Sequence, residues 1–264
     1  IIFGIFKIPN IFYWPLASLI LVWGSILVII STYPIFSMEI FLFSISAGLI
    51  FAFLTRNDRE KSFIFKENME LINSRKYNEA NENLNKLLEK YPNDRLILLN
   101  KISILIFNND YSELLSVSNK ILEKHPKDSY ALNAKAHVLI ELGKYEEADT
   151  IVNNVLEKEK NNETALANKG EILSNKGNHA EAIEYYDKAL KNFPDKQKPK
   201  FLGLNLIVLV PVDQEIAKIW ISKGQAHKNL SEFSEALESF NQALILDPDS
   251  SEAKKLQIEL ESGS

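Results

Sequence analysis

The chain has 264 residues, of which 35 are acidic and 30 are lysine or arginine, so its net charge at neutral pH is -5. This acidic balance excludes the basic surface that nucleic-acid binding requires. The chain contains no cysteine, which excludes disulfide bonds, thiolate metal ligands and cysteine nucleophiles. Its charges are unevenly distributed, because residues 1–54 carry only Lys7 and Glu39.

The first 54 residues predict two membrane-spanning helices, at residues 12–31 and 35–54. Each run has twenty residues, which rise about 30 Å as a helix, the thickness of the hydrocarbon core of a bilayer. Only three residues separate the runs, so we interpret residues 1–55 as a transmembrane helical hairpin that contacts the lipid bilayer through residues 12–54. Glu39 lies about 7 Å along the second helix from Pro34, and we expect its carboxylate to reach the headgroups.

The cations around these two runs predict their orientation. Lys7 precedes the first run, the turn between the runs has no cation, and three cations follow the second run: Arg56, Arg59 and Lys61. Lysine and arginine accumulate on the cytoplasmic side of membrane proteins. We therefore expect a multi-pass membrane localisation with the rest of the chain on the cytoplasmic side.

Two other interpretations bear on this topology. A cleaved signal peptide is a poor explanation of the first run, because the run lacks a small-residue cleavage pattern and a second run follows at once. Residues 162–164 and 229–231 match the acceptor pattern of N-glycosylation. A glycan on either site would place the second part of the chain outside the cell.

Beyond residue 60 the sequence repeats with a period of 34 residues. Tyr77, Tyr111 and Tyr145 are each 34 residues apart, and His179 continues the series. A second position keeps the same spacing: Ala80, Leu114, Ala148 and Ala182. A further unit begins late, since Ala236 follows Ala182 by one period plus an insertion. A fixed period of this length indicates a repeat architecture.

The content of the units resembles the tetratricopeptide repeat, a helix–turn–helix unit of 34 residues. Small residues stand where the two helices of one unit would cross, as Ala136, Gly170 and Gly224 do, and Pro92 and Pro126 end units because proline cannot continue a helix. The resemblance implies an all-α fold in which residues 56–264 form an α-solenoid of about five repeats. We expect the repeats, an insertion and a capping helix at these ranges: repeats 61–94, 95–128, 129–162, 163–196 and 217–250, insertion 197–216, and cap 251–261.

The second unit and the insertion depart from the pattern. Ile102 and Leu114 are bulky where small residues are usual, so we expect the second unit to be the least regular. The insertion contains a ten-residue apolar run, residues 201–210, which is too short to span a bilayer. We interpret this run as an inter-repeat connection that packs on the solenoid; the alternative is that it contacts a partner, the membrane surface or the concave face.

One group of side chains could carry chemistry. The resemblance places His137 on the concave face of the solenoid, with Glu141 one turn later and Glu171 at the same position of the next unit. Such a group could bind a metal, but two carboxylates and one histidine on a repeat surface are more typical of a solvated binding face. No phosphate loop, catalytic triad or zinc spacing is present. We therefore expect no enzymatic activity, cofactor or metal.

The resemblance also implies which residues contact a partner. The candidate partner-binding residues on the concave face are Tyr130, Asn133, His137, Glu141, Glu171, Asn175, Lys218, Gln225 and Lys228. The first two units are apolar at the corresponding positions: Phe65, Met69, Ile72, Leu96, Leu99, Ile106 and Phe107. These residues form either a ligand site or a surface that packs on the membrane hairpin or on the insertion. The clamp of Lys, Asn and Arg with which some family members hold a C-terminal carboxylate is not matched.

These observations give two hypotheses for function. The first is a non-enzymatic, membrane-anchored scaffold that binds a protein or peptide partner through the concave face of the repeats. The alternative is a structural or assembly subunit of a membrane protein complex in which the transmembrane hairpin makes the main contacts.

Overall fold

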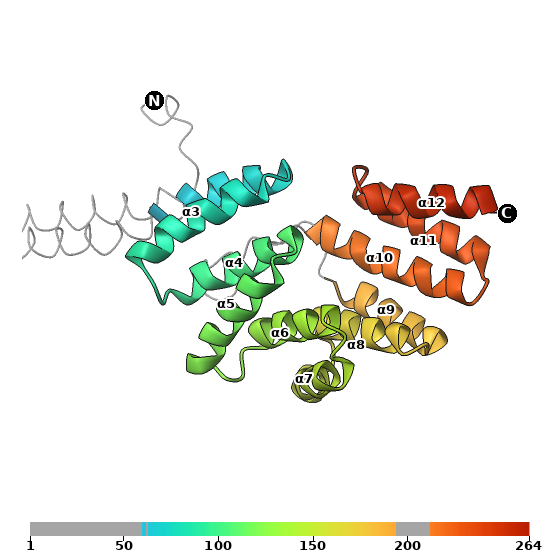
Figure 1. The fold of residues 1–264 in the computed structure, drawn as a ribbon, viewed down its shortest axis with the longest axis horizontal. Helices are drawn as coiled ribbons and strands as arrows, with labels where there is room; N and C mark the ends of the chain where they lie inside the picture. Colours follow the sequence, from blue (N-terminus) through green and yellow to red (C-terminus); the bar gives the residue numbers. More distant parts are fainter. Residues whose placement is uncertain (1–59, 62, 194–211, 264) are drawn as a thin grey trace, which may run out of the picture. The chain divides into compact units, whose positions relative to one another are not determined.

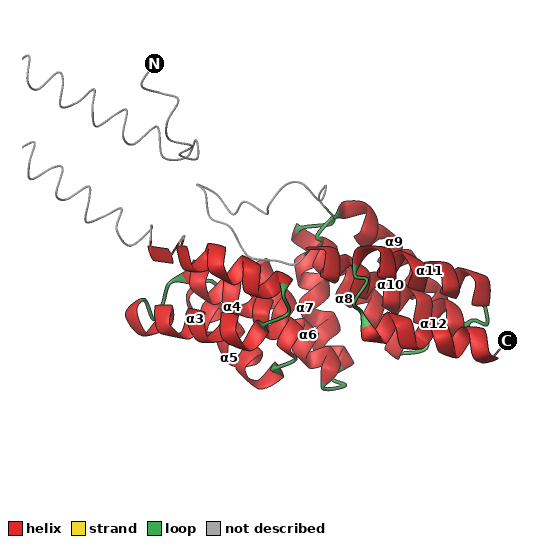
Figure 2. Ribbon diagram, turned by 90° about the horizontal axis from the view of Figure 1, so that it is seen from above, coloured by secondary structure: helices red, strands yellow, loops and turns green. Residues whose placement is uncertain are grey.

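The computed structural model describes residues 60–61, 63–193 and 212–263, and this part of the chain is helical without any strand. Residues 63–73 are helical and precede α3. Ten helices follow in chain order (Figures 1 and 2): α3 (Tyr77–Lys90), α4 (Arg95–Asn108), α5 (Tyr111–Lys124), α6 (Ser129–Glu141), α7 (Tyr145–Lys158), α8 (Glu163–Asn175), α9 (His179–Asn192), α10 (Val212–Asn229), α11 (Phe233–Leu246) and α12 (Ser251–Gly263).

The helices recur with the period of the sequence. α3, α5, α7 and α9 begin at residues 77, 111, 145 and 179, and α4, α6 and α8 begin at residues 95, 129 and 163, so both series advance by the same step. Each helix packs against the next along the chain. The described residues therefore form an all-α solenoid in which α4, α6, α8 and α10 are the first helices of successive units and α5, α7, α9 and α11 are the second.

Short polar side chains and left-handed turns set the ends of these helices. Asp94, Asp128 and Asn162 cap α4, α6 and α8, since each side chain accepts hydrogen bonds from backbone N–H groups of the first turn. Gly143 and Gly177 adopt φ angles of 71° and 84° in the turns before α7 and α9. In the second unit Asn109 takes this conformation with φ 56°, because asparagine tolerates the left-handed region better than other residues with a side chain.

The two helices of a unit cross closely where the first helix has a small residue. A Cβ atom added to Gly170 would lie 2.7 Å from Cε1 of Tyr186, and one added to Gly224 would lie 2.5 Å from Cε1 of Phe240. Both rings are buried, with 2% of Tyr186 and none of Phe240 exposed. The ring of the second helix thus fills the space that a side chain on the first helix would need.

A series of hydrophobic clusters joins neighbouring units. Ile102 and Leu114, the bulky residues of the second unit, are fully buried in the cluster that joins α4, α5 and α6. Phe65, Ile72 and Leu99 are buried as well, so these apolar residues of the first two units belong to the core and not to an exposed ligand site. These three residues therefore pack within the solenoid; the expected packing on the hairpin or on the apolar run of the insertion lies outside the described residues.

The predicted multi-pass membrane localisation is wrong. Among the described residues no helix is long and apolar enough to cross a membrane. The physical reason is that most of the labelled helices have 13 or 14 residues and span about 21 Å or less, while α10, with 18 residues, carries five charged side chains: Asp213, Glu215, Lys218, Lys223 and Lys228. The expected hairpin of residues 1–55, with its spans at 12–31 and 35–54 and its bilayer contact, lies outside the described residues.

The start of α10 differs from the repeat boundary expected from sequence. α10 begins at Val212, ahead of the fifth expected repeat, so residues 212–216 of the expected insertion are helical. The remainder of the insertion up to residue 211, including the apolar run, lies outside the described residues. α10 is therefore longer than the other first helices by about one turn.

The close crossing at Gly170 generates a prediction about stability. We expect Gly170→Ala to lower the free energy of unfolding by about 1–3 kcal/mol, because the new methyl group would overlap the buried ring of Tyr186. Urea unfolding followed by circular dichroism measures this change. The control is Glu157→Ala on an exposed site of α7, for which we expect a change within about 0.5 kcal/mol. Equal stability of the two variants would contradict the overlap.

Candidate functional site

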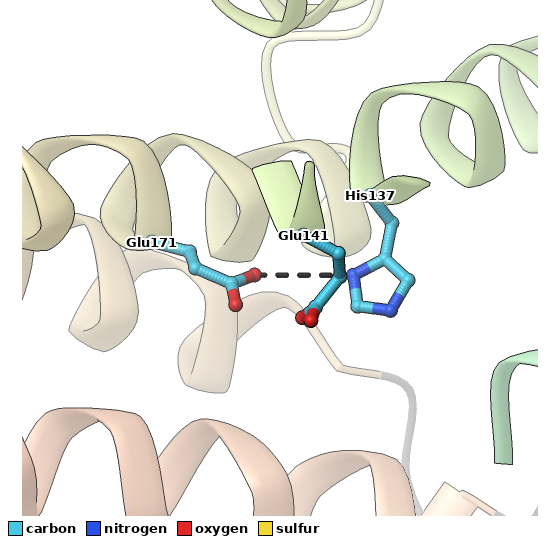
Figure 3. A group of neighbouring side chains, drawn as sticks. All are labelled: His137, Glu141 and Glu171. Atoms are coloured by element: carbon cyan, nitrogen blue, oxygen red, sulfur yellow. Dashed lines mark ion pairs between the residues drawn. The ribbon is translucent and has the colours of Figure 1, made fainter. Parts of the chain in front are cut away.

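His137, Glu141 and Glu171 converge on one side of the solenoid (Figure 3). His137 and Glu141 lie one turn apart on α6, and Glu171 occupies the position of α8 that is equivalent to His137 in the next unit. The nearest nitrogen and oxygen atoms of this pair, Nδ1 of His137 and Oε2 of Glu171, are 4.0 Å apart. One ligand atom from each of the three residues lies within 4.8 Å of the others. We call these three residues the concave cluster, after the face on which the family resemblance places them.

The surroundings shift the pKa values of His137 and Glu171 in opposite directions. Burial lowers the pKa of His137 to about 4, and the ammonium of Lys218 adds to this effect while the carboxylate of Glu141 opposes it. Burial and then the charge of Glu141 raise the pKa of Glu171 to about 7. Water still reaches both side chains, which expose 19% and 30% of their surface. At neutral pH the imidazole is therefore uncharged, and the pair does not form an ion pair.

Aromatic side chains border the concave cluster. The ring of Tyr111 meets the ring of His137 edge to face, with 6.0 Å between centroids. Burial, together with the charge of Glu141 and a hydrogen bond to it, raises the pKa of Tyr111 to about 12. Burial and the charge of Glu171 also raise the pKa of Tyr186. Each of these shifts keeps the phenol neutral near the carboxylates.

Lys218 of α10 supplies the positive charge nearest the cluster. Its Nζ atom lies 4.6 Å from the ring centroid of Phe107, at the end of α4. Four carboxylates act on its charge: Glu252, Glu171, Glu141 and Glu215. Although water reaches the side chain, surrounding protein atoms partly desolvate the ammonium and lower the pKa of Lys218. In the described residues no lysine or arginine nitrogen lies within 4.0 Å of the carboxylates of Glu141 or Glu171.

Three of the other predicted site residues are accessible to solvent. Asn175 is exposed, and its amide nitrogen donates to the carbonyl oxygen of Glu171 at 2.9 Å. Lys228 pairs with Glu259 at 3.4 Å, and Gln225 is half-buried on α10. These three residues lie on the same series of first helices as the concave cluster.

Tyr130 and Asn133 have contacts inside the solenoid. The hydroxyl of Tyr130 lies 2.6 Å from Oγ of Ser103. Asn133 is only 3% exposed, and its amide donates to Oδ1 of Asn162 at 2.8 Å, the same oxygen that caps α8. Asn133 therefore positions the start of a neighbouring helix and offers little surface to a partner.

Sequence reasoning missed two residues beside the concave cluster, Tyr111 and Glu252. Tyr111 belongs to the repeated framework positions, and its place at the start of a second helix brings its ring next to the first helix of the following unit. Glu252 lies in α12, and its charge acts on Glu171 and Lys218. The spacing of the repeats could have suggested Tyr111; no pattern in the sequence indicated Glu252.

The concave cluster contains a ligand set that borderline divalent cations accept. Imidazole and carboxylate groups suit zinc or manganese, and the three side chains come from two neighbouring helices. The ammonium of Lys218 acts on the same carboxylates and disfavours a second cation there. The arrangement therefore fits a polar binding surface better than a resident metal centre.

Comparisons with known proteins agree with this architecture. The family model of the tetratricopeptide repeat matches residues 217–250. The model described as the N-terminal TPR repeats region of Psidin matches residues 99–202. No curated protein matches the chain closely. The two family matches support assignment of the repeats to the tetratricopeptide repeat family.

Solved structures share the fold at low sequence identity. A thermophilic TPR protein of Thermus thermophilus, TTC0263, is 14% identical with a TM-score of 0.57, and the match covers 77% of this chain and 97% of that one. A chain of the APC/C hetero-tetramer Cut9–Hcn1 is 13% identical with a TM-score of 0.60, covering 93% of this chain and 46% of that one. The described residues thus share the α-solenoid fold of these TPR structures.

The opposite pKa shifts of His137 and Glu171 predict a compensated pH dependence. Between about pH 4.5 and 6.5 the unfolded chain holds a proton on His137, whereas the folded chain holds one on Glu171. The two states then bind equal numbers of protons at these residues, so the two effects on the pH dependence of the free energy of unfolding cancel. We expect Glu171→Gln to leave only the histidine effect, so that stability rises with pH from about 4 to 6.5 relative to the parent chain. We expect His137→Gln to leave only the glutamate effect, so that stability falls as pH rises from about 4.5 to 7.

Urea unfolding of the parent chain and both variants across this pH range measures the slopes. The matched control is Glu157→Gln, an exposed carboxyl on α7 outside the concave cluster, whose slope should follow the parent chain. Parallel pH profiles for His137→Gln and Glu171→Gln would contradict the assigned proton positions.

Proposed function

We propose that this chain is a non-enzymatic scaffold that binds a protein or peptide partner through the concave face of its repeats. The observation that supports this most directly is the convergence of His137, Glu141 and Glu171 from two successive first helices. Within the described residues their carboxylates have no lysine or arginine nitrogen within 4.0 Å, so they keep hydrogen-bonding capacity for a ligand. The likeness to TPR scaffolds supports binding over catalysis.

The candidate residues would have different roles in this binding. Glu141 and Glu171 would accept hydrogen bonds, and the neutral imidazole of His137 would donate or accept one. Lys218, Gln225 and Lys228 would contact the partner along α10. Tyr130 and Asn133 would act indirectly, because their polar groups already bind Ser103 and Asn162.

Site-specific photo-cross-linking tests the proposed face. A benzophenone amino acid placed at Asn175, which is exposed and adjacent to Glu171, should give cross-linked partner in cells or extracts of the source organism. The same group placed at Glu157, exposed on the second helix α7, should give none. Equal cross-linking from both positions, or cross-linking from Glu157 alone, would move the binding site away from the concave face.

The contribution of the concave cluster is tested in the chain labelled at Asn175. We expect His137→Ala with Glu141→Ala and Glu171→Ala to reduce the cross-linked product by about tenfold, because a few residues near the centre of an interface contribute most of its binding energy. The control changes two exposed carboxylates elsewhere, Glu123→Ala with Glu157→Ala. Circular dichroism establishes that both variants are folded, and an unchanged yield from the triple variant would exclude the cluster from the interface.

A further inference from the structure

The fifth unit of the solenoid contacts the first two units. In a linear array of repeats each unit contacts only its neighbours. Here the guanidinium of Arg75, just before α3, pairs with the carboxylate of Asp247, just after α11. The hydroxyl of Tyr77 donates to Oε1 of Gln214 at 2.6 Å. These pairs join residues that are 172 and 137 positions apart in the chain.

The first two turns of α10 make most of this contact. Gln214 reaches Tyr77 in the first unit, and the Nζ atom of Lys218 lies over the ring of Phe107 in the second unit. Between them, Oε1 of Glu215 accepts a hydrogen bond from Oγ1 of Thr164 at 3.2 Å. Gln214 and Glu215 belong to the part of α10 that precedes the expected repeat. The extra turn of α10 thus reaches across the face that carries the first helices of the earlier units.

The two aromatic side chains of the first two units that contact α10 also pack on each other. The rings of Tyr77 and Phe107 stack with 5.9 Å between centroids and 21° between planes. Tyr77 also contacts Gln214 of α10, and Phe107 contacts Lys218 of α10. One pair of side chains from the first two units therefore meets two successive turns of the fifth unit.

These contacts differ in kind from the junctions between neighbouring units. Every neighbouring junction has a cluster of buried apolar side chains, but among the described residues no such cluster combines the first or second unit with the fifth. The contacts are an ion pair, a hydrogen bond and a cation–π contact between partly exposed side chains; 39% of the Arg75 side chain and 14% of the Asp247 side chain are exposed. Exposed ion pairs and hydrogen bonds of this kind are individually weak and are screened by salt.

We propose that these contacts form a clasp that opens and closes, so that the solenoid alternates between a closed ring and an open array. The clasp consists of Arg75, Tyr77 and Phe107 on the first two units and of Gln214, Lys218 and Asp247 on the fifth. Opening it separates none of the apolar clusters of the described residues, so every junction between neighbouring units remains. The elastic element is the intervening array, because small changes at successive junctions add up along a solenoid.

The clasp also bears on partner binding. The ammonium of Lys218 interacts electrostatically with Glu141 and Glu171, which are the carboxylates of the proposed binding face. In the closed form the ammonium of Lys218 is held beside Phe107, where it acts on these carboxylates, and opening the clasp releases it from that position. The clasp therefore acts as an autoinhibitory contact against a partner with a cationic group; this consequence, unlike the clasp itself, rests on the proposed function.

Distance measurement between two spin labels tests the clasp without any partner. The chain has no cysteine, so Lys86→Cys on α3 and Glu238→Cys on α11, both exposed, give two unique attachment sites. Double electron–electron resonance should show a predominant short distance in the otherwise unchanged chain. Arg75→Ala with Gln214→Ala should shift the distribution to longer and broader distances, and raising NaCl from about 0.1 M to 1 M should shift the unchanged chain the same way.

A matched variant separates loss of the clasp from loss of charge. Glu184→Ala with Lys188→Ala removes an exposed ion pair of 3.6 Å within α9 and should leave the distance distribution unchanged. An identical, narrow distribution in the clasp variant and in the unchanged chain at both salt concentrations would overturn the proposal.

Thermal unfolding gives a second readout. Because the clasp variant keeps all neighbouring junctions, its melting temperature should stay close to that of the Glu184→Ala with Lys188→Ala control. A large loss of melting temperature in the clasp variant alone would show that the contact is part of the folded core and not an opening device. Failure of partner binding would leave these measurements unaffected, and failure of the clasp would leave the cross-linking result at Asn175 interpretable.

Discussion

The close crossing of two helices within a unit is the constraint on which the rest of the structure depends. At Gly170 and Gly224 the first helix lacks a side chain, and the buried ring of Tyr186 or Phe240 on the second helix fills that space. Because the crossing of the first and second helix recurs once in each unit, each first helix is related to the next one by a similar rotation and translation. Residues at equivalent positions of these helices therefore come close together, although they are far apart in sequence.

The concave cluster is a direct consequence of that repetition. His137 and Glu171 occupy the same position in successive first helices, and Glu141 lies one turn beyond His137. Burial makes charge unfavourable on both His137 and Glu171, so it lowers the pKa of the imidazole and, together with the charge of Glu141, raises the pKa of the carboxyl. In the proposed function, this polar surface supplies the hydrogen-bonding groups that would recognise a partner.

Long-range contacts add a property that a linear repeat array lacks. α10 brings Gln214 of its extra turn to Tyr77 and brings Lys218 to Phe107, so the ends of the array meet through a hydrogen bond, an ion pair and a cation–π contact. The apolar clusters between neighbouring units stabilise the folded solenoid, while the contacts of the fifth unit with the first two determine whether the solenoid is closed or open. These two energies are separate, which allows the closure to change without unfolding any unit.

The sequence by itself determined the repeat and much of the local structure, because the period, the small residues and the glycine turns are local features that each unit carries alone. It also indicated His137, Glu141 and Glu171 as one group, since equivalent positions of a repeat are predictable neighbours. It did not indicate that Asn133 is buried against Asn162, that Glu252 acts on the cluster, or that α10 begins at Val212. The membrane localisation inferred from hydropathy was wrong, because none of the described helices is long and apolar enough to cross a membrane. Only the tertiary structure decided which polar groups bind within the chain and which remain accessible, because that depends on the summed displacement of five units and on where the last unit meets the first.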